Sequence, residues 1–112
     1  MGYYTNFDVE TDGKVPLEDV IKFIDENAGL LFSDDYDISS MFENGDSDDQ
    51  WMWYDHEEVM KIISKKFPEL LITLHGEGEE NSDMWKEYYL GGKVQVAKAE
   101  ITYPKFNEKL LV

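Results

Sequence analysis

Hydrophobic and polar side chains alternate from Tyr3 to Thr11, a pattern that predicts a half-buried β-strand. Asp12-Gly13 has the composition of a turn and ends this strand. The apolar spacing then becomes that of a helix, because Pro16 suits a first helical turn and Gly29 suits a helix end. The apolar stripe of this helix consists of Leu17, Val20, Ile21, Ile24 and Ala28. Its opposite face carries mostly acidic residues, so we expect it to present negative charge to solvent.

A second helix is predicted between Asp55 and Pro68. Asp55 is a favourable N-cap residue, and Glu58 follows three positions later, which is the arrangement of a capping box. The apolar stripe that would face the core consists of Val59, Met60, Ile62, Ile63 and Phe67. His56 falls in the first turn, where we expect it to be exposed.

The chain after this helix has the pattern of β-strands. Leu70–Leu74 is a short apolar run, and residues 75–83 are rich in turn formers. Hydrophobic and polar residues alternate over Met84–Leu90, and a longer β-like run occupies residues 93–103. Because Gly91-Gly92 separates these two runs, they predict a β-hairpin with a tight turn.

The segment between the two helices has two interpretations. Residues 34–42 mix apolar residues with acids and serines, and Asn44-Gly45 is a strong turn signal before the aromatic run Trp51–Tyr54. If both sides of this turn are strands, the order is β-α-β-β-α-β followed by a hairpin, a ferredoxin-like plait with an extension. If the first side is a loop, the order is β-α-β-α-β-β-β. Either order predicts one α+β domain over residues 1–112, with a mixed or antiparallel sheet, two helices on one face, and a short tail at residues 106–112.

Charge makes this small fold strongly asymmetric. The chain has 25 Asp and Glu against 10 basic residues, so 10 − 25 gives a formal net charge of −15, and every basic residue is Lys. Residues 1–60 hold 17 acids and two Lys, whereas residues 61–112 hold eight of each, so the whole excess lies in the first part. A chain with this charge and without Arg is a poor candidate for binding nucleic acid, phosphate or an anionic membrane directly.

Composition excludes several further classes of protein. A content of 42% hydrophobic residues is enough for a core, so general disorder is not expected. The absence of cysteine excludes disulfides, thiolate nucleophiles and thiolate metal sites. No apolar run is long enough to span a membrane, and the segment that begins at Met1 has no signal-peptide pattern. We therefore expect a cytoplasmic protein without a cofactor.

The most distinctive local feature is an acidic segment followed by aromatic residues. The segment contains no basic residue, and its seven acids are Asp34, Asp35, Asp37, Glu43, Asp46, Asp48 and Asp49. Trp51, Trp53 and Tyr54 follow directly. On a strand, Trp51 and Trp53 would share one face. They would either belong to the core or form an aromatic anchor ringed by acids, which is a composition suited to a basic partner.

Patterns that would carry catalysis or metal binding are weak. His75, Glu77 and Glu79 could ligate a metal or supply paired carboxylates, but a glycine-containing loop accounts for the same residues. Four residues match positions one, three, five and twelve of a calcium-binding loop: Asp46, Asp48, Gln50 and Glu57. Trp51 stands where that loop requires glycine. No nucleophile elbow, phosphate-binding or metalloprotease motif occurs, so neither an enzyme nor a metal site is predicted.

Arrays of carboxylates can imitate the phosphates of a nucleic acid. Acids on one side of a strand recur about every 6.6 to 6.8 Å, and helices bring i, i+4 and i+7 acids together. A protein with such an array would be steered by its field into the basic groove of a nucleic-acid enzyme and would displace the substrate.

Two resemblances accompany this interpretation. The small, acidic, cysteine-free chain resembles phage and prophage anti-defence inhibitors of the anti-CRISPR and anti-restriction type, which implies occupation of a nucleic-acid channel. Three stretches are similar to small bacterial and phage proteins with a predicted ferredoxin-like domain: Phe67-Pro68-Glu69, residues 70–80, and Trp85 to Lys93. The second similarity covers under half of the chain, and neither carries a catalytic motif from which site residues can be assigned.

The sequence therefore predicts a non-enzymatic inhibitor that binds a host nucleic-acid-binding protein, such as an RNA-guided nuclease, in the host cytoplasm if it is phage-encoded. The seven acids of residues 34–49 would replace phosphates, and Trp51, Trp53 or Tyr54 would anchor the complex. The alternative is a regulatory protein-interaction domain in which acidity serves solubility.

Overall fold

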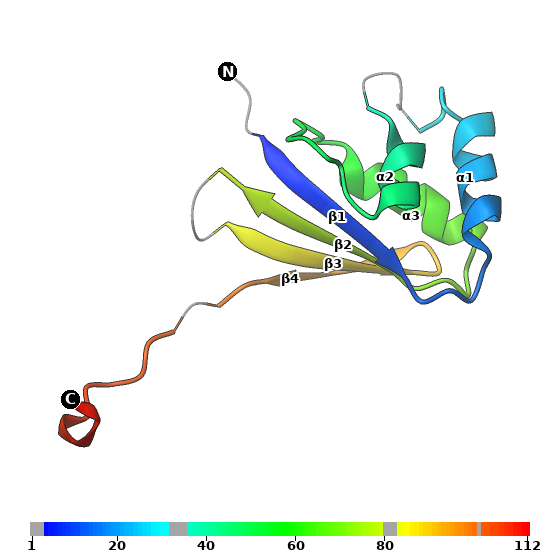
Figure 1. Ribbon diagram of the computed structural model, residues 1–112. Coiled ribbons are helices and arrows are strands. Elements are labelled where there is room, and N and C mark those ends of the chain that lie inside the picture. The colour runs from blue at the N-terminus through cyan, green and yellow to red at the C-terminus, as the bar shows by residue number, and fades with distance from the viewer. Residues whose placement is uncertain (1–3, 32–35, 80–82, 101) are drawn as a thin grey trace.

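A four-stranded antiparallel sheet with helices on one face forms the body of the protein (Figure 1). The computed structural model describes residues 4–31, 36–79, 83–100 and 102–112. The elements are β1 (Thr5–Thr11), α1 (Leu17–Glu26), α2 (Ile38–Asn44), α3 (His56–Lys66), β2 (Ile72–Gly78), β3 (Met84–Leu90), β4 (Lys93–Lys98) and a 3-10 turn, η1 (Glu108–Leu110). The strands lie in the order β1-β2-β3-β4, each antiparallel to the next. The predicted α+β class and the C-terminal hairpin are confirmed.

The alternation in each strand decides which side chains enter the core. In β1, Thr5, Phe7 and Val9 are buried and the even-numbered residues between them are exposed, as the sequence predicts. The register places Phe7 opposite Gly76, and Gly76 opposite Trp85. A Cβ on Gly76 would lie 2.1 Å from the Trp85 ring. Glycine is therefore required here because the indole lies over this strand.

The helices form a second layer over the sheet. Helix α2 packs against β1, α3 packs against β3 and β4, and α1 packs on α2 and α3 (Figure 1). Val20 and Ile24 of α1 and Val59, Met60 and Ile63 of α3 are buried, so the predicted apolar stripes are confirmed except at Leu17, which is exposed at the start of α1.

The ferredoxin-like order is wrong, because residues 38–44 form helix α2 where that order requires a strand. The Asp37 carboxylate accepts a hydrogen bond of 3.0 Å from the Ser40 amide, which is a helix N-cap. Gly45 has a φ of 89°, the left-handed conformation of a helix C-terminus. Asn44-Gly45 therefore ends a helix and does not turn a hairpin. Trp51 forms only an isolated bridge to Thr5, so the sheet keeps four strands and a simple meander order over the described residues.

Smaller differences lie at the ends of elements. Asp55 precedes α3 as predicted, but its side chain makes no capping hydrogen bond. Strand β2 continues to Gly78 through residues that were predicted to be a turn, because they pair with both β1 and β3. Strand β4 ends at Lys98, and the chain beyond it extends away from the sheet (Figure 1). None of the helices in the described ranges combines the length and apolarity needed to cross a membrane.

Candidate functional site

A loop rich in aspartate lies along the outer edge of β1. Residues 45–50, which we call the acidic loop, follow α2 and bond to the strand through main-chain groups. The Val9 amide donates to the Gly45 carbonyl at 2.8 Å, and the Ser47 amide donates to the Phe7 carbonyl at 2.8 Å. Trp51, just after the loop, exchanges two hydrogen bonds of 2.9 Å with Thr5. The edge of β1 is therefore covered by the chain itself.

The carboxylates of the acidic loop face solvent and also shape the loop. Asp46, Asp48 and Asp49 are exposed. The Asp46 carboxylate accepts a 3.0 Å hydrogen bond from the Asp48 amide, and Asp49 accepts one of 2.8 Å from the Gln50 amide. Asp48 itself has a φ of 61°, a conformation that aspartate tolerates better than most residues. Asparagine could make the same bonds, so the local fold alone does not account for the charge.

A groove between α1 and α2 continues the negative charge. The groove is lined by Leu17, Glu18, Ile21, Lys22, Asp25, Glu26 and Glu43. The Ser39 hydroxyl of α2 donates a hydrogen bond to the Asp25 carboxylate of α1 and joins the two walls. The one lysine of the groove lies 4.0 Å from the Glu26 carboxylate on the same helix, a surface pair of small energetic weight. Four carboxylates around an apolar floor suit a basic, partly apolar segment of a partner.

The groove and the acidic loop meet at α2. Glu43 lines the groove, and Asp46 follows it by three residues. We call the exposed carboxylates of both parts the acidic surface: Glu18, Asp25, Glu26, Glu43, Asp46, Asp48 and Asp49. The sequence predicts the acidic face of α1 but does not reveal that it joins the segment after α2, because that depends on how the two helices pack. Residues 46–49 form a loop, so their carboxylates do not have the regular spacing along a strand that was described above for phosphate mimicry.

The remaining predicted acids, Asp34, Asp35 and Asp37, are not part of the acidic surface. Asp37 is exposed at the N-terminus of α2, where hydrogen bonds from the Ser40 hydroxyl and amide lower the pKa of its carboxyl group. Its position is thus explained by capping. Asp34 and Asp35 lie outside the described residues.

The predicted aromatic anchors are divided between core and surface. Trp51 is 8% exposed and Trp53 5%, so neither can serve as a surface anchor, and that prediction is wrong for both. Trp53 packs edge-on against Phe7, with ring centroids 5.3 Å apart, and Trp51 stacks on Tyr36 at 4.9 Å. Tyr54 is 67% exposed and is the member of the run that a partner could contact.

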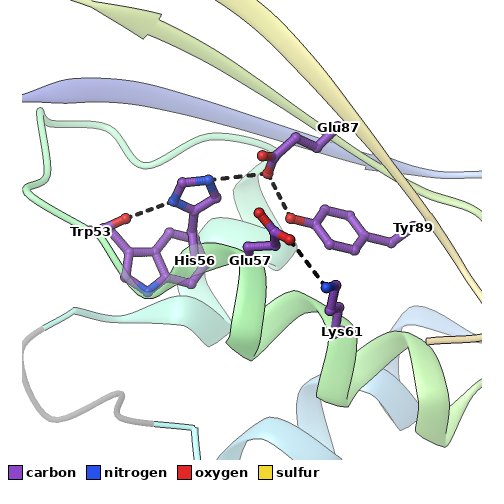
Figure 2. Close-up of polar contacts among 6 residues, drawn as sticks. All are labelled: Trp53, His56, Glu57, Lys61, Glu87 and Tyr89. Carbon is purple, nitrogen blue, oxygen red and sulfur yellow. Dashed lines mark hydrogen bonds and ion pairs between the residues drawn. The ribbon is translucent and has the colours of Figure 1, made fainter. Parts of the chain in front are cut away.

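A buried polar network joins Trp53, His56, Glu87 and Tyr89 (Figure 2). The His56 Nε2 atom of α3 lies 3.1 Å from a Glu87 carboxylate oxygen of β3, and the Tyr89 hydroxyl donates to the same oxygen at 2.6 Å. The other ring nitrogen, Nδ1, lies 2.8 Å from the Trp53 carbonyl oxygen. A carbonyl can only accept, so Nδ1 carries a proton. The His56 and Glu87 side chains are only 20% and 7% exposed, so the expectation of an exposed His56 is wrong.

The surroundings of His56 and Glu87 favour the charged form of both groups. Burial disfavours the charged form of His56, but the hydrogen bond and negative charge of Glu87 outweigh it and raise the pKa of the imidazole. Burial likewise opposes ionisation of Glu87, but hydrogen bonds from His56 and Tyr89 lower its pKa. Burial and the adjacent carboxylate raise the pKa of Tyr89. These groups are bonded to one another, so the arrangement joins α3 to the sheet and has no unpaired imidazole to act as a base.

One sequence signal could have revealed this network. Glu87 occupies an inward position of the alternating strand β3, between Trp85 and Tyr89. A carboxylate at a core position requires a hydrogen-bonding or basic partner, and few basic side chains of this sequence lie near the core. Trp85 then stacks on the partner, His56, with ring centroids 5.1 Å apart and planes inclined by 20°.

The candidate metal residues are not brought together. His75 faces away from the helices and lies 3.4 Å from the Asp8 carboxylate of β1. Within the described ranges, no three His, Asp or Glu side chains are grouped so that they could hold a metal ion.

No protein-family model, curated protein or solved structure matches this chain.

Proposed function

We propose that the protein is a non-enzymatic inhibitor whose acidic surface occupies the basic groove of a nucleic-acid-binding protein, such as an RNA-guided or restriction nuclease of a host. The observation that carries the proposal is the joining of the α1–α2 groove to the acidic loop, which gathers seven exposed carboxylates on adjoining elements. A basic groove that normally holds phosphates would meet a comparable density of negative charge.

The distribution of lysine supports this orientation. Only Lys14 and Lys22 accompany the acids of residues 4–50. The other eight lysines lie on α3, on strands β3 and β4, and in the tail: Lys61, Lys65, Lys66, Lys86, Lys93, Lys98, Lys105 and Lys109. The strands β1 and β4 are opposite edges of the sheet (Figure 1). The molecule therefore has an acidic side and a side of mixed charge. A uniform solvating charge would not require this separation.

The test compares two variants that lose the same number of negative charges from different parts of the surface. One variant carries Asp46→Asn, Asp48→Asn and Asp49→Asn, which keep the side-chain oxygens that accept the loop hydrogen bonds. The matched variant carries Glu58→Gln, Glu69→Gln and Glu77→Gln, three exposed residues outside the acidic surface. Both triple variants have a formal charge of −12, because three charges are removed from −15.

Inhibition is measured as competition with duplex DNA for a panel of RNA-guided and restriction nucleases. We expect the loop variant to lose on the order of tenfold in affinity, about 1.4 kcal/mol, while the matched variant stays near wild type. Affinity should fall steeply with salt, because the attraction acts between exposed charges. Equal inhibition by both variants, or no inhibition of any member of the panel, would contradict the proposal.

A further inference from the structure

The outer side of β4 presents backbone groups without a partner. The register of β3 with β4, together with the 2.9 Å hydrogen bond from the Ala99 amide to the Met84 carbonyl, shows that alternate residues of β4 bond to β3. The intervening residues, Val94, Val96 and Lys98, direct their N–H and C=O groups outward. In the described part of the chain nothing hydrogen-bonds to them. An open edge of this kind can accept another strand.

Exposed apolar side chains lie on β4 and on the segment that follows it. Val96 is 51% exposed, and Tyr103 and Phe106 in the segment beyond β4 are 87% and 80% exposed. That segment leaves the sheet and extends into solvent (Figure 1). The Cα radius of gyration is 16.8 Å, against about 13 Å for a compact chain of this length. These apolar residues would be covered if a second molecule lay along β4.

Charge identifies the occupant as a second copy of this chain. Strand β4 contains Lys93 and Lys98 and no acid, whereas the acidic surface lies at the β1 side. Two copies that meet at β4 therefore place their acidic surfaces at opposite ends of the joined sheet. Contact through any other edge or helix of the acidic half would bring like charges together.

We propose that two copies pair β4 with β4, antiparallel about a two-fold axis at Val96, to form a continuous eight-stranded sheet. In this register Val96 faces its own copy, Val94 faces Lys98, and Lys93 faces Ala99. No two lysines face each other directly. Because outward-facing residues meet in pairs, each can exchange the hydrogen bonds that it lacks in one copy. This inference is independent of the proposed function.

The same register also brings the segment after β4 against the second copy. The residue after Ala99 is Glu100, which comes opposite Gly92 of the second copy. In each copy the Gly92 amide donates to the Ser64 hydroxyl of α3 at 3.0 Å, so the hairpin lies against the end of that helix. Lys65 and Lys66 are exposed there. Glu100 would thus approach basic residues, and the apolar tail would lie across the second copy.

Sedimentation equilibrium over micromolar to millimolar protein tests the interface. Val96→Lys places two like charges face to face at the axis, and Val96→Glu does the same with the opposite sign. We expect each variant alone to dimerise on the order of tenfold more weakly than wild type, and an equimolar mixture to regain dimer through Lys–Glu pairs. The control, Leu30→Lys, changes another exposed apolar residue away from β4 and should dimerise like wild type.

Salt provides a second measurement. Each copy has a charge of −15, so added salt should screen the repulsion between two copies and strengthen the dimer. Added salt should instead weaken the attraction between the acidic surface and a basic partner. The two proposals can therefore fail separately. A wild-type protein that is monomeric throughout the concentration range would overturn the dimer, as would dimerisation that is unchanged by Val96→Lys. Circular dichroism spectra that match wild type would show that each variant is folded.

Discussion

The two edges of the sheet are protected differently. The edge of β1 is covered by the acidic loop and by Trp51, whose main-chain groups bond to the strand. The edge of β4 has no such cover among the described residues, and the chain beyond it turns away. An exposed edge invites pairing with another chain, and charge beside an edge discourages it. The β1 edge is therefore closed to a partner strand, and the β4 edge is open.

The acidic loop has two roles that must be separated in experiments. Its main chain and the Ser47 hydroxyl complete the sheet, while its carboxylates face solvent. A substitution that disrupts the loop would uncover β1 and change the charge at once. Replacement of aspartate by asparagine removes charge and leaves the hydrogen-bond acceptors in place, so it tests the surface role alone.

The largest effect on stability is expected from substitution of His56, which connects the segment after the acidic loop to strand β3. It bonds to Trp53, just after the acidic loop, and to Glu87 in the strand next to β4. His56→Phe would leave a buried carboxylate without its counter-charge, and we expect a loss of about 3 kcal/mol in the free energy of unfolding in urea. His75→Phe is the control: its pair with Asp8 lies on the open face, and the change should cost less than about 1 kcal/mol. Equal losses of unfolding free energy in the two variants would show that the buried His56–Glu87 pair does not stabilise the contact between α3 and the sheet.

The same pair predicts a pH dependence. The pKa of His56 is raised above 6.5, so its stabilisation is complete below that pH and is lost as the pH rises through the folded-state value. The pKa of Glu87 is lowered below 4.5, so its stabilisation is complete above that pH and is lost as the pH falls through its folded-state value. The difference in unfolding free energy between wild type and His56→Phe should thus be greatest between about pH 4.5 and 6.5. A difference that does not vary from pH 4 to 9 would contradict an ion pair.

A smaller loss is expected at Gly76, midway between the edges. A Cβ there would lie 2.1 Å from the Trp85 indole, which stacks on His56. Gly76→Ala must displace the ring, and we expect a loss of about 2 kcal/mol on urea unfolding. Gly29→Ala is the control, because nothing lies within 4 Å of its Cβ and its φ is not positive. That change should be neutral or slightly stabilising. Equal stability of the two variants would show that the ring moves freely.

The sequence predicts the parts of this fold that rest on local pattern. Strand β1, the stripes of α1 and α3, and the hairpin at Gly91-Gly92 follow from alternation, helical spacing and turn composition. Helix α2 was missed because Asn44-Gly45 suits either a hairpin turn or a helix end. The cap at Asp37 and the spacing of Ile38, Met41 and Phe42 would have favoured the helix.

The candidate site was less predictable, because it depends on contacts between distant segments. Exposure of Asp46, Asp48 and Asp49 agrees with the prediction, but the contribution of Asp25 and Glu26 requires the packing of α1 on α2. The anchor role of Trp51 and Trp53 was wrong, since Phe7 and Tyr36 bury them. The His56–Glu87 pair joins residues 31 positions apart, and periodicity alone does not reveal it.

The smallest effect is expected at the β1 edge itself. The Ser47 hydroxyl accepts a hydrogen bond from the Phe7 amide at 3.2 Å and donates to the Asp49 carbonyl at 2.6 Å. Ser47→Ala leaves that buried amide without a partner and should cost about 1 kcal/mol on urea unfolding. Amide hydrogen exchange should become faster at Phe7 and stay unchanged in β4, because only the cover of β1 is weakened. Ser40→Ala removes an exposed hydroxyl that donates to Asp37 and should cost less than Ser47→Ala. If Ser47→Ala accelerated exchange equally at both edges, the two edges would open together, and the contrast between a closed and an open edge would not hold.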